Sequence, residues 1–125
     1  MLDDLNILIV EDEAIIALDL SMILEERGAT VMGPCGTVEE AVAAVDPSLH
    51  VAILDVDLRG QTVFPVADRL RQIGKPFVFH TGRYDTNALR ARYGEDTPVL
   101  VKPAGDTAIV KALAQARAQA ADDPR

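Results

Sequence analysis

The feature that most constrains the fold is a regular alternation of short apolar segments with stretches of helical periodicity. The apolar segments are rich in Val and Ile, which is typical of strands buried on both faces of a sheet. They occupy residues 5–10, 30–33, 50–54, 76–81 and 98–101. Strands that alternate with helices predict an α/β fold, in which right-handed crossovers build a parallel sheet.

Apolar residues between these segments recur at the spacing of one helical face. The first three intervals contain Ile16, Leu20, Ile23 and Leu24, then Val38, Ala41, Val42 and Val45, then Val63, Val66, Ala67 and Leu70. The fourth interval offers only residues 86–93, so we expect a short or mobile fourth helix. A fifth helix begins near Gly105 and runs into a polar tail at about residues 121–125. About five helices are therefore predicted.

Length and charge limit what the chain can do. Its 125 residues, 49% of them hydrophobic, are enough for one domain with a core at about residues 5–120. A formal net charge of −8 disfavours direct binding to nucleic acid or to an anionic membrane. The chain has no apolar run of membrane-spanning length and a single cysteine, Cys35, so we expect a cytoplasmic protein without an internal disulfide.

Acidic residues directly follow two of the predicted strands. Glu11 and Asp12 follow residues 5–10, and Asp55 follows residues 50–54. If the two strands are neighbours in a parallel sheet, these acids meet at one edge, which is costly unless a cation neutralises them. Carboxylate ligands without Cys or His favour Mg²⁺ over zinc. The pattern predicts a magnesium site, although each acid alone, and Glu13 in particular, is equally typical of a solvated loop.

Polar residues also end the last two predicted strands, with Thr81 after residues 76–80 and Lys102 after residues 98–101. In a parallel sheet these side chains lie at the same edge as the acids. A nucleophilic carboxylate, a divalent cation, a hydroxyl and an ammonium are the groups that neutralise a phosphoryl group in transfer. The combination indicates phosphoryl chemistry.

At these residues the sequence resembles the receiver domains of two-component response regulators over nearly its whole length. The resemblance is carried by Glu11 and Asp12, by Asp55 after Val-Ala-Ile-Leu, by Thr81, and by Lys102 before Pro. It implies a flavodoxin-like, doubly wound five-stranded parallel sheet with strand order 2-1-3-4-5. It also implies that residues 1–125 are a stand-alone phosphoacceptor signalling domain rather than an enzyme.

The resemblance implies a role for each residue at this edge. Asp55 would accept the phosphoryl group, and Thr81 and Lys102 would bind its oxygens. The donor would be a sensor histidine kinase or a histidine phosphotransfer protein. The signal would leave through contacts with a downstream protein or by onward phosphotransfer.

The implied metal ligands overlap with these residues. Asp12 and Asp55 would bind Mg²⁺ directly, and Glu11 would bind it directly or through water. The backbone carbonyl of Asp57 would complete the protein ligands.

Residues 76–82, Pro-Phe-Val-Phe-His-Thr-Gly, resemble the Pro-Phe-x-Phe-Ala-Thr-Gly-Tyr signature of the FAT GUY receivers of alphaproteobacteria. This narrower resemblance implies a kinase of the HWE type. His80 replaces the Ala of the signature and is expected to be a packed or hydrogen-bonded side chain. Val99 stands where many receivers carry an aromatic switch residue. We expect Arg59 to be a solvated charge, and we predict that Asp57 and Arg83 approach each other.

Three other interpretations remain open. Residues 54–58 resemble the Asp-x-Asp motif of haloacid-dehalogenase-type phosphatases, in which Asp55 would be the nucleophile and Asp57 the acid/base. Those enzymes usually carry the motif on the first strand of a longer chain. A phosphorylation-independent pseudo-receiver is disfavoured by the complete set of site residues. A flavodoxin-like binder of small molecules is disfavoured because acids stand where a Gly-rich phosphate loop would lie.

Overall fold

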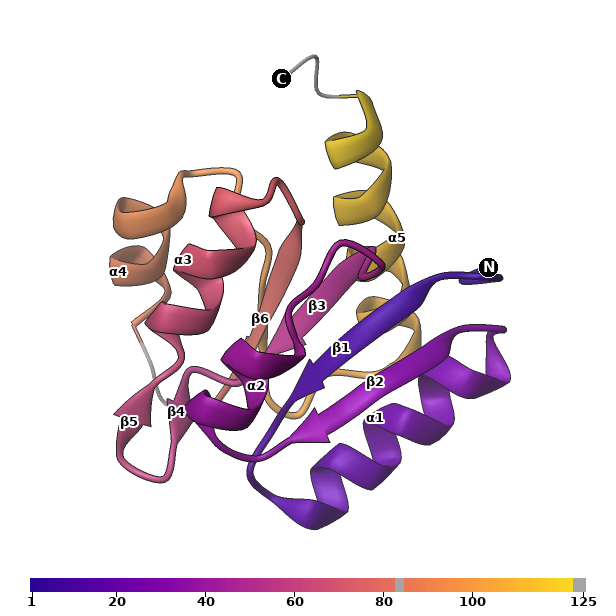
Figure 1. Cartoon of the computed structure of the whole chain (residues 1–125), viewed down its shortest axis with the longest axis horizontal. Coiled ribbons are helices and arrows are strands. Elements are labelled where there is room, and N and C mark those ends of the chain that lie inside the picture. The colour runs from indigo at the N-terminus through magenta and orange to yellow at the C-terminus, as the bar shows by residue number, and fades with distance from the viewer. Residues whose placement is uncertain (83–84, 123–125) are drawn as a thin grey trace.

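The computed structural model describes residues 1–82 and 85–122, which form a parallel sheet with helices on both faces (Figure 1). The strands are β1 (Asn6–Val10), β2 (Thr30–Cys35), β3 (Val51–Leu54), β4 (Asp57–Leu58), β5 (Gln61–Thr62), β6 (Phe77–Thr81) and β7 (Val99–Val101). The helices are α1 (Ala14–Glu26), α2 (Val38–Ala44), α3 (Phe64–Gln72), α4 (Thr86–Tyr93) and α5 (Asp106–Asp122).

The main sheet has the order β2-β1-β3-β6-β7, and all of its pairs are parallel. Since β6 and β7 are its fourth and fifth strands, the predicted order 2-1-3-4-5 and the flavodoxin-like fold are confirmed. β4 and β5 form a separate antiparallel hairpin, which the sequence analysis did not predict. The order places β1 beside β3, so that the chain segments after these two strands lie next to each other.

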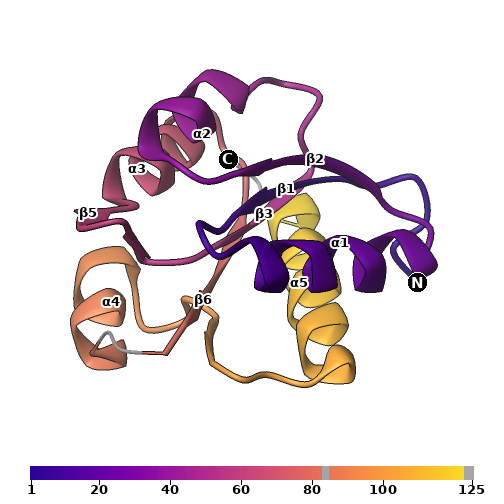
Figure 2. The same ribbon diagram turned by 90° about the horizontal axis from the view of Figure 1, so that it is seen from below.

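Helices cover the two faces of the sheet in separate groups, as the view from below shows (Figure 2). On one face α1 and α5 enclose a core that includes Ile7, Ile53 and Val78. On the other face α2, α3 and α4 cover Leu8 and Phe79. No helix in the described ranges is long and apolar enough to cross a lipid bilayer.

The edges of the sheet differ from the prediction that every strand is buried on both faces. β1, β3 and β6 are buried almost throughout, whereas most of β2 is accessible and Val101 in β7 is 59% exposed. β2 and β7 lie at the two edges of the sheet, where each has a neighbouring strand on one side only and the helices cover the strand incompletely. β2 also continues through Gly33 and Pro34 to Cys35, with a shift of register opposite Leu8 to Val10. An edge strand tolerates proline and an irregular register because one side of it carries no ladder.

The core also begins earlier than predicted. Leu2 is fully buried in the cluster beneath α1 and α5, and its N–H donates to the carbonyl of Arg27 at 3.0 Å. Cys35 is a free, buried side chain, as expected of a packing residue.

α4 is short, as predicted, with eight residues, while its mobility stays a prediction. Two side chains hold it against the domain. Leu89 is fully buried, and the ring of Tyr93 packs against Phe64, Phe77 and Phe79. The hydroxyl of Tyr93 donates to Oδ1 of Asp68 in α3 at 2.8 Å. Burial, with a smaller contribution from Asp68, raises the pKa of Tyr93 to about 12, so this hydroxyl stays protonated.

Replacement of Tyr93 tests how strongly α4 is held. Tyr93→Phe keeps the ring and loses the bond to Asp68, and should lower the free energy of unfolding by about 1 kcal/mol. Tyr93→Ala also removes the aromatic contacts and should cost about 3 kcal/mol. Urea unfolding measures both. In an Asp68→Ala background Tyr93→Phe should cost less, because the hydroxyl then loses only its other bonds, such as the one it accepts from Nε of Arg92 at 3.1 Å. An unchanged cost there would contradict the proposed contact with Asp68.

Candidate functional site

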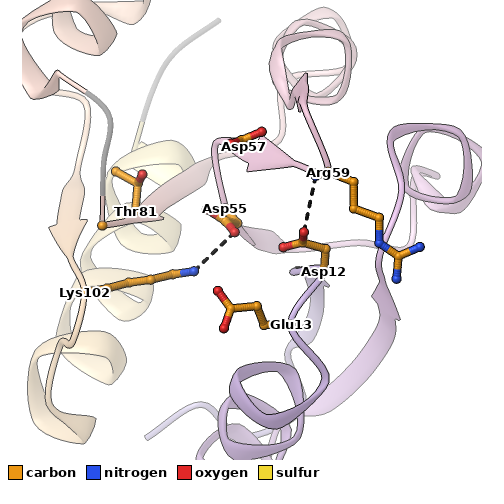
Figure 3. A pocket seen from close by; sticks show the side chains of 8 residues that line it. Asp12, Glu13, Asp55, Asp57, Arg59, Thr81 and Lys102 are labelled. Atoms are coloured by element: carbon orange, nitrogen blue, oxygen red, sulfur yellow. Dashed lines mark hydrogen bonds and ion pairs between the residues drawn. The ribbon is translucent and has the colours of Figure 1, made fainter.

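A cavity of about 340 Å³ opens where the chain leaves the carboxyl ends of the central strands (Figure 3). It is lined by Asp12, Glu13, Asp55, Asp57, Arg59, Thr81, Gly82 and Lys102. This is the sheet edge at which the sequence predicted the site.

The parallel ladder brings three acids together. Beyond the ends of β1 and β3, the N–H of Glu11 donates to the carbonyl of Cys35 at 2.9 Å, and the N–H of Asp55 donates to the carbonyl of Val10 at 2.8 Å. Glu11 and Asp55 are buried, and Asp12 is half-buried. One carboxylate oxygen from each lies within 4.8 Å of the others. The predicted convergence of these acids is confirmed.

Lys102 supplies positive charge to this cluster. Its Nζ donates to Oε1 of Glu11 at 2.6 Å and to Oδ2 of Asp55 at 3.2 Å. Figure 3 shows the side chain extended toward Asp55. Because β7 is an edge strand, this contact joins residues that follow β7 and β1, across the ends of β6 and β3. The contact with Glu11 was not predicted.

The ionisation of these groups reflects both burial and pairing. Burial raises the pKa of Glu11 and of Asp55, although Lys102 acts in the opposite direction. Burial alone would lower the pKa of Lys102, but its bonds to the two carboxylates outweigh this and raise it. The cluster contains three carboxylates and one ammonium, so it carries an excess of negative charge when all four groups are ionised.

The raised pKa of Asp55 predicts that its charge destabilises the metal-free protein. The native state holds the proton more tightly than the unfolded chain, so stability falls as pH rises from the ordinary pKa of 3.8 through the raised value. At pH 7 in a chelator, Asp55→Asn should raise the free energy of unfolding, because it removes a buried negative charge from the acid cluster. The gain should shrink as the pH is lowered into that window. Urea unfolding at several pH values measures this, and a destabilised Asp55→Asn protein at pH 7 would contradict it.

The hairpin β4–β5 forms one wall of the cavity. Arg59 and Gly60 have φ of 53° and 85°, so both turn residues lie in the left-handed region that a tight two-residue hairpin needs. The N–H of Arg59 donates to Oδ2 of Asp12 at 3.2 Å, which orients that carboxylate. The Arg59 side chain is exposed, as expected of a solvated charge, whereas the bond from its backbone N–H to Asp12 was not predicted. The Arg-Gly pair is the only signal in the sequence that could have located this turn.

Asp57 has its side chain engaged in the same turn. Its Oδ1 accepts from the N–H of Gly60 at 3.0 Å, and Figure 3 shows the carboxylate apart from Asp12 and Asp55. The backbone carbonyl of Asp57 as a metal ligand stays a prediction. The predicted approach of Asp57 and Arg83 lies outside the described residues.

Thr81 and Glu13 complete the lining. Thr81 is buried at the end of β6, and its carbonyl accepts from the N–H of Lys102 at 3.0 Å. Glu13 is exposed, as a solvated residue should be, and its N–H donates to Oε2 of Glu11 at 3.1 Å. The hydroxyl and the ammonium thus reach the same cavity as the acids.

The acid cluster fits a hard divalent cation. Its three donors are carboxylate oxygens from Glu11, Asp12 and Asp55, and the open cavity beside them leaves room for water ligands. The excess negative charge favours the same ion. Lys102 already bonds two of these carboxylates, so a cation has to share or replace its contacts.

Comparisons with solved structures identify similar proteins. No protein-family model and no curated protein sequence matches the chain. SdrG from Sphingomonas melonis Fr1 is 42% identical, with a TM-score of 0.74, over 89% of this chain and 94% of SdrG. The signal receiver domain of a modulated diguanylate cyclase from Desulfovibrio desulfuricans G20 is 28% identical, with a TM-score of 0.83, over 95% of this chain and 98% of that one.

A third similar structure is the REC domain of the response regulator PhyR from Erythrobacter litoralis. It is 26% identical, with a TM-score of 0.79, over 92% of this chain and 91% of that one. These matches span nearly the whole of each chain. Two of the three are named as receiver domains, one of a modulated diguanylate cyclase and one of a response regulator.

Proposed function

Because the chain belongs to the receiver domains of response regulators, we propose that it accepts a phosphoryl group on Asp55 and signals through its phosphorylated form. The observation that carries the proposal is the meeting of Asp55 with an acid cluster and the ammonium of Lys102 at one cavity. These groups come from strands far apart in the sequence, and together they suit the transfer of a phosphoryl group.

In the proposed reaction a carboxylate oxygen of Asp55 forms a bond to phosphorus while the bond from phosphorus to the donor's leaving group breaks. With a phosphohistidine donor, the leaving imidazole nitrogen takes the electron pair of the P–N bond. Lys102 and the hydroxyl of Thr81 bind oxygens of the transferred group. The wall formed by the β4–β5 hairpin keeps Asp12 in place through the N–H of Arg59.

Mg²⁺ is the proposed cofactor, held by Glu11, Asp12, Asp55 and the backbone carbonyl of Asp57. When bound, it neutralises the oxygens of the phosphoryl group. Glu11 and Asp55 each have a second role, since both also bond Lys102 in the structure.

The proposed donor is a sensor histidine kinase, of the HWE type if the FAT GUY resemblance holds, or a histidine phosphotransfer protein. The proposed output is a contact with a downstream protein or onward phosphotransfer in the cytoplasm. Val99 cannot act as an aromatic switch, so we propose that α4 carries the change. The phosphatase alternative needs the Asp57 carboxylate as acid/base, and its bond to Gly60 does not favour that role.

The proposal is tested by incubating the protein with acetyl phosphate and Mg²⁺. Peptide mapping by mass spectrometry after chemical trapping of the acyl phosphate should locate one phosphoryl group, on Asp55. A parallel sample in chelator should stay unlabelled. Labelling of another residue contradicts the proposed role of Asp55. Absence of label with acetyl phosphate, phosphoramidate and a phosphorylated kinase alike would favour the pseudo-receiver.

A further inference from the structure

His80 is a buried histidine whose ring has no hydrogen-bond partner in the part of the chain that the structure describes. It is 5% exposed, and neither Nδ1 nor Nε2 has a partner among the described residues. The expectation of a packed or hydrogen-bonded side chain is confirmed by the packing of the ring. Buried polar atoms are nearly always paired because leaving them unpaired costs free energy. We therefore expect the free ring nitrogen of His80 to gain a hydrogen-bond partner in another state of the protein.

The sheet register places His80 beside Lys102. His80 on β6 pairs with Leu100 on β7, and Lys102 lies two residues after Leu100. Because side chains alternate along a strand, those of His80 and Lys102 project from the same face of the sheet. Both residues line a second cavity, of about 130 Å³, between α1 and the start of α5. Lys102 thus borders this cavity and the acid cavity at once.

The charge state of His80 makes it an acceptor. Burial lowers the pKa of the ring, and the nearby Lys102 ammonium lowers it further, against an opposing effect of Glu11. A neutral imidazole carries one N–H and one free lone pair. The ammonium of Lys102 has three protons, of which Glu11 and Asp55 receive two. Asp19 in α1 also lines the second cavity, but it is exposed to solvent.

We propose that His80 is a positioning residue for Lys102: its free ring nitrogen accepts a hydrogen bond from the ammonium when Mg²⁺ takes Glu11. This inference rests on the proposed function. The ammonium and the cation compete for the same carboxylates, so metal binding leaves Lys102 with one acceptor fewer. His80 offers a buried acceptor on the same face, with room in the second cavity for the ammonium to turn. The lysine then stays close to Asp55 for the arriving phosphoryl group.

Titration with Mg²⁺ alone tests the proposal. His80→Leu fills the same space without an acceptor and should weaken Mg²⁺ binding about fivefold, the equivalent of one ordinary hydrogen bond. His80→Asn and His80→Gln keep a carbonyl acceptor, and at least one should restore most of the affinity. In a Lys102→Met background His80→Leu should leave the affinity unchanged, because the ammonium it positions is gone.

Nitrogen NMR of the His80 ring tests the same contact without changing the ring. In the wild-type protein Mg²⁺ should shift the resonance of the unprotonated nitrogen, and in Lys102→Met it should not. An equal loss of affinity from His80→Leu in both backgrounds would overturn the proposal, as would a ring that does not respond to Mg²⁺. Either of these results, in a wild-type protein that binds Mg²⁺ and is labelled on Asp55, would contradict only the role of His80. A wild-type protein that does neither contradicts the proposed function itself.

Discussion

Asp55→Asn is expected to reduce labelling by acetyl phosphate to background, a loss of at least about 100-fold. The amide has nearly the shape of the carboxylate and can still accept a bond from Lys102, so the cavity should be preserved. It cannot act as the anionic nucleophile. Intact-protein mass spectrometry over time, at saturating Mg²⁺, measures the loss.

The matched control is Asp57→Asn, two residues further along. Its side-chain oxygen can still accept from the N–H of Gly60, and its backbone carbonyl is unchanged. Labelling should therefore stay within about threefold of the wild type, as expected for an exposed polar substitution. Normal labelling of Asp55→Asn would refute the proposed phosphoacceptor. A collapse of labelling in Asp57→Asn as well as in Asp55→Asn would instead favour the phosphatase alternative, in which Asp55 is the nucleophile and Asp57 is the acid/base.

Asp12→Asn should weaken Mg²⁺ binding by at least about tenfold, because it removes a full negative charge from the cluster of three acids. The amide oxygen can still accept from the N–H of Arg59, so the β4–β5 hairpin should keep its place. The thermal stabilisation that wild-type protein gains from Mg²⁺ by mass action should largely disappear.

Glu13→Gln provides the control for this substitution. Glu13 lines the same cavity as Asp12, and its substitution removes the same charge, but Glu13 lies outside the acid cluster. Its Mg²⁺ affinity should stay within about threefold of wild type, since exposed charges are well screened. Equal losses in Asp12→Asn and Glu13→Gln would show that the cavity attracts Mg²⁺ only through its overall charge. An unchanged titration in Asp12→Asn would place the ion elsewhere.

The five strands of the main sheet and the site edge followed from the sequence because both depend on patterns that extend over many residues, whereas the strand order was implied by the resemblance to receiver domains. Apolar segments marked the five strands of the main sheet, and the polar residue after each central strand marked the edge where Asp55 and Thr81 lie. The limits of the edge strands were less accurate. β2 passes through Gly33 and Pro34, residues that would break a central strand.

Features that depend on a single contact were not predictable in this way. The β4–β5 hairpin has two residues in each strand, too few for any periodicity, and the role of Arg59 depends on its backbone N–H. The bond between Lys102 and Glu11 depends on how two side chains extend toward each other across the ends of two strands. The unpaired ring of His80 could not be inferred either, because the sequence does not state which groups surround a buried side chain.

The long reach of Lys102 has a consequence for how the domain folds. Glu11 and Asp55 come from the first half of the chain, and the ammonium that bonds both of them comes after β7. A chain that has formed β1, β2 and β3 but not yet docked β7 gathers these carboxylates without that compensating charge. Docking of the last strand then relieves the repulsion that the earlier strands create. The first half of the sheet should therefore be a poor folding unit alone, and unfolding should be a single cooperative transition.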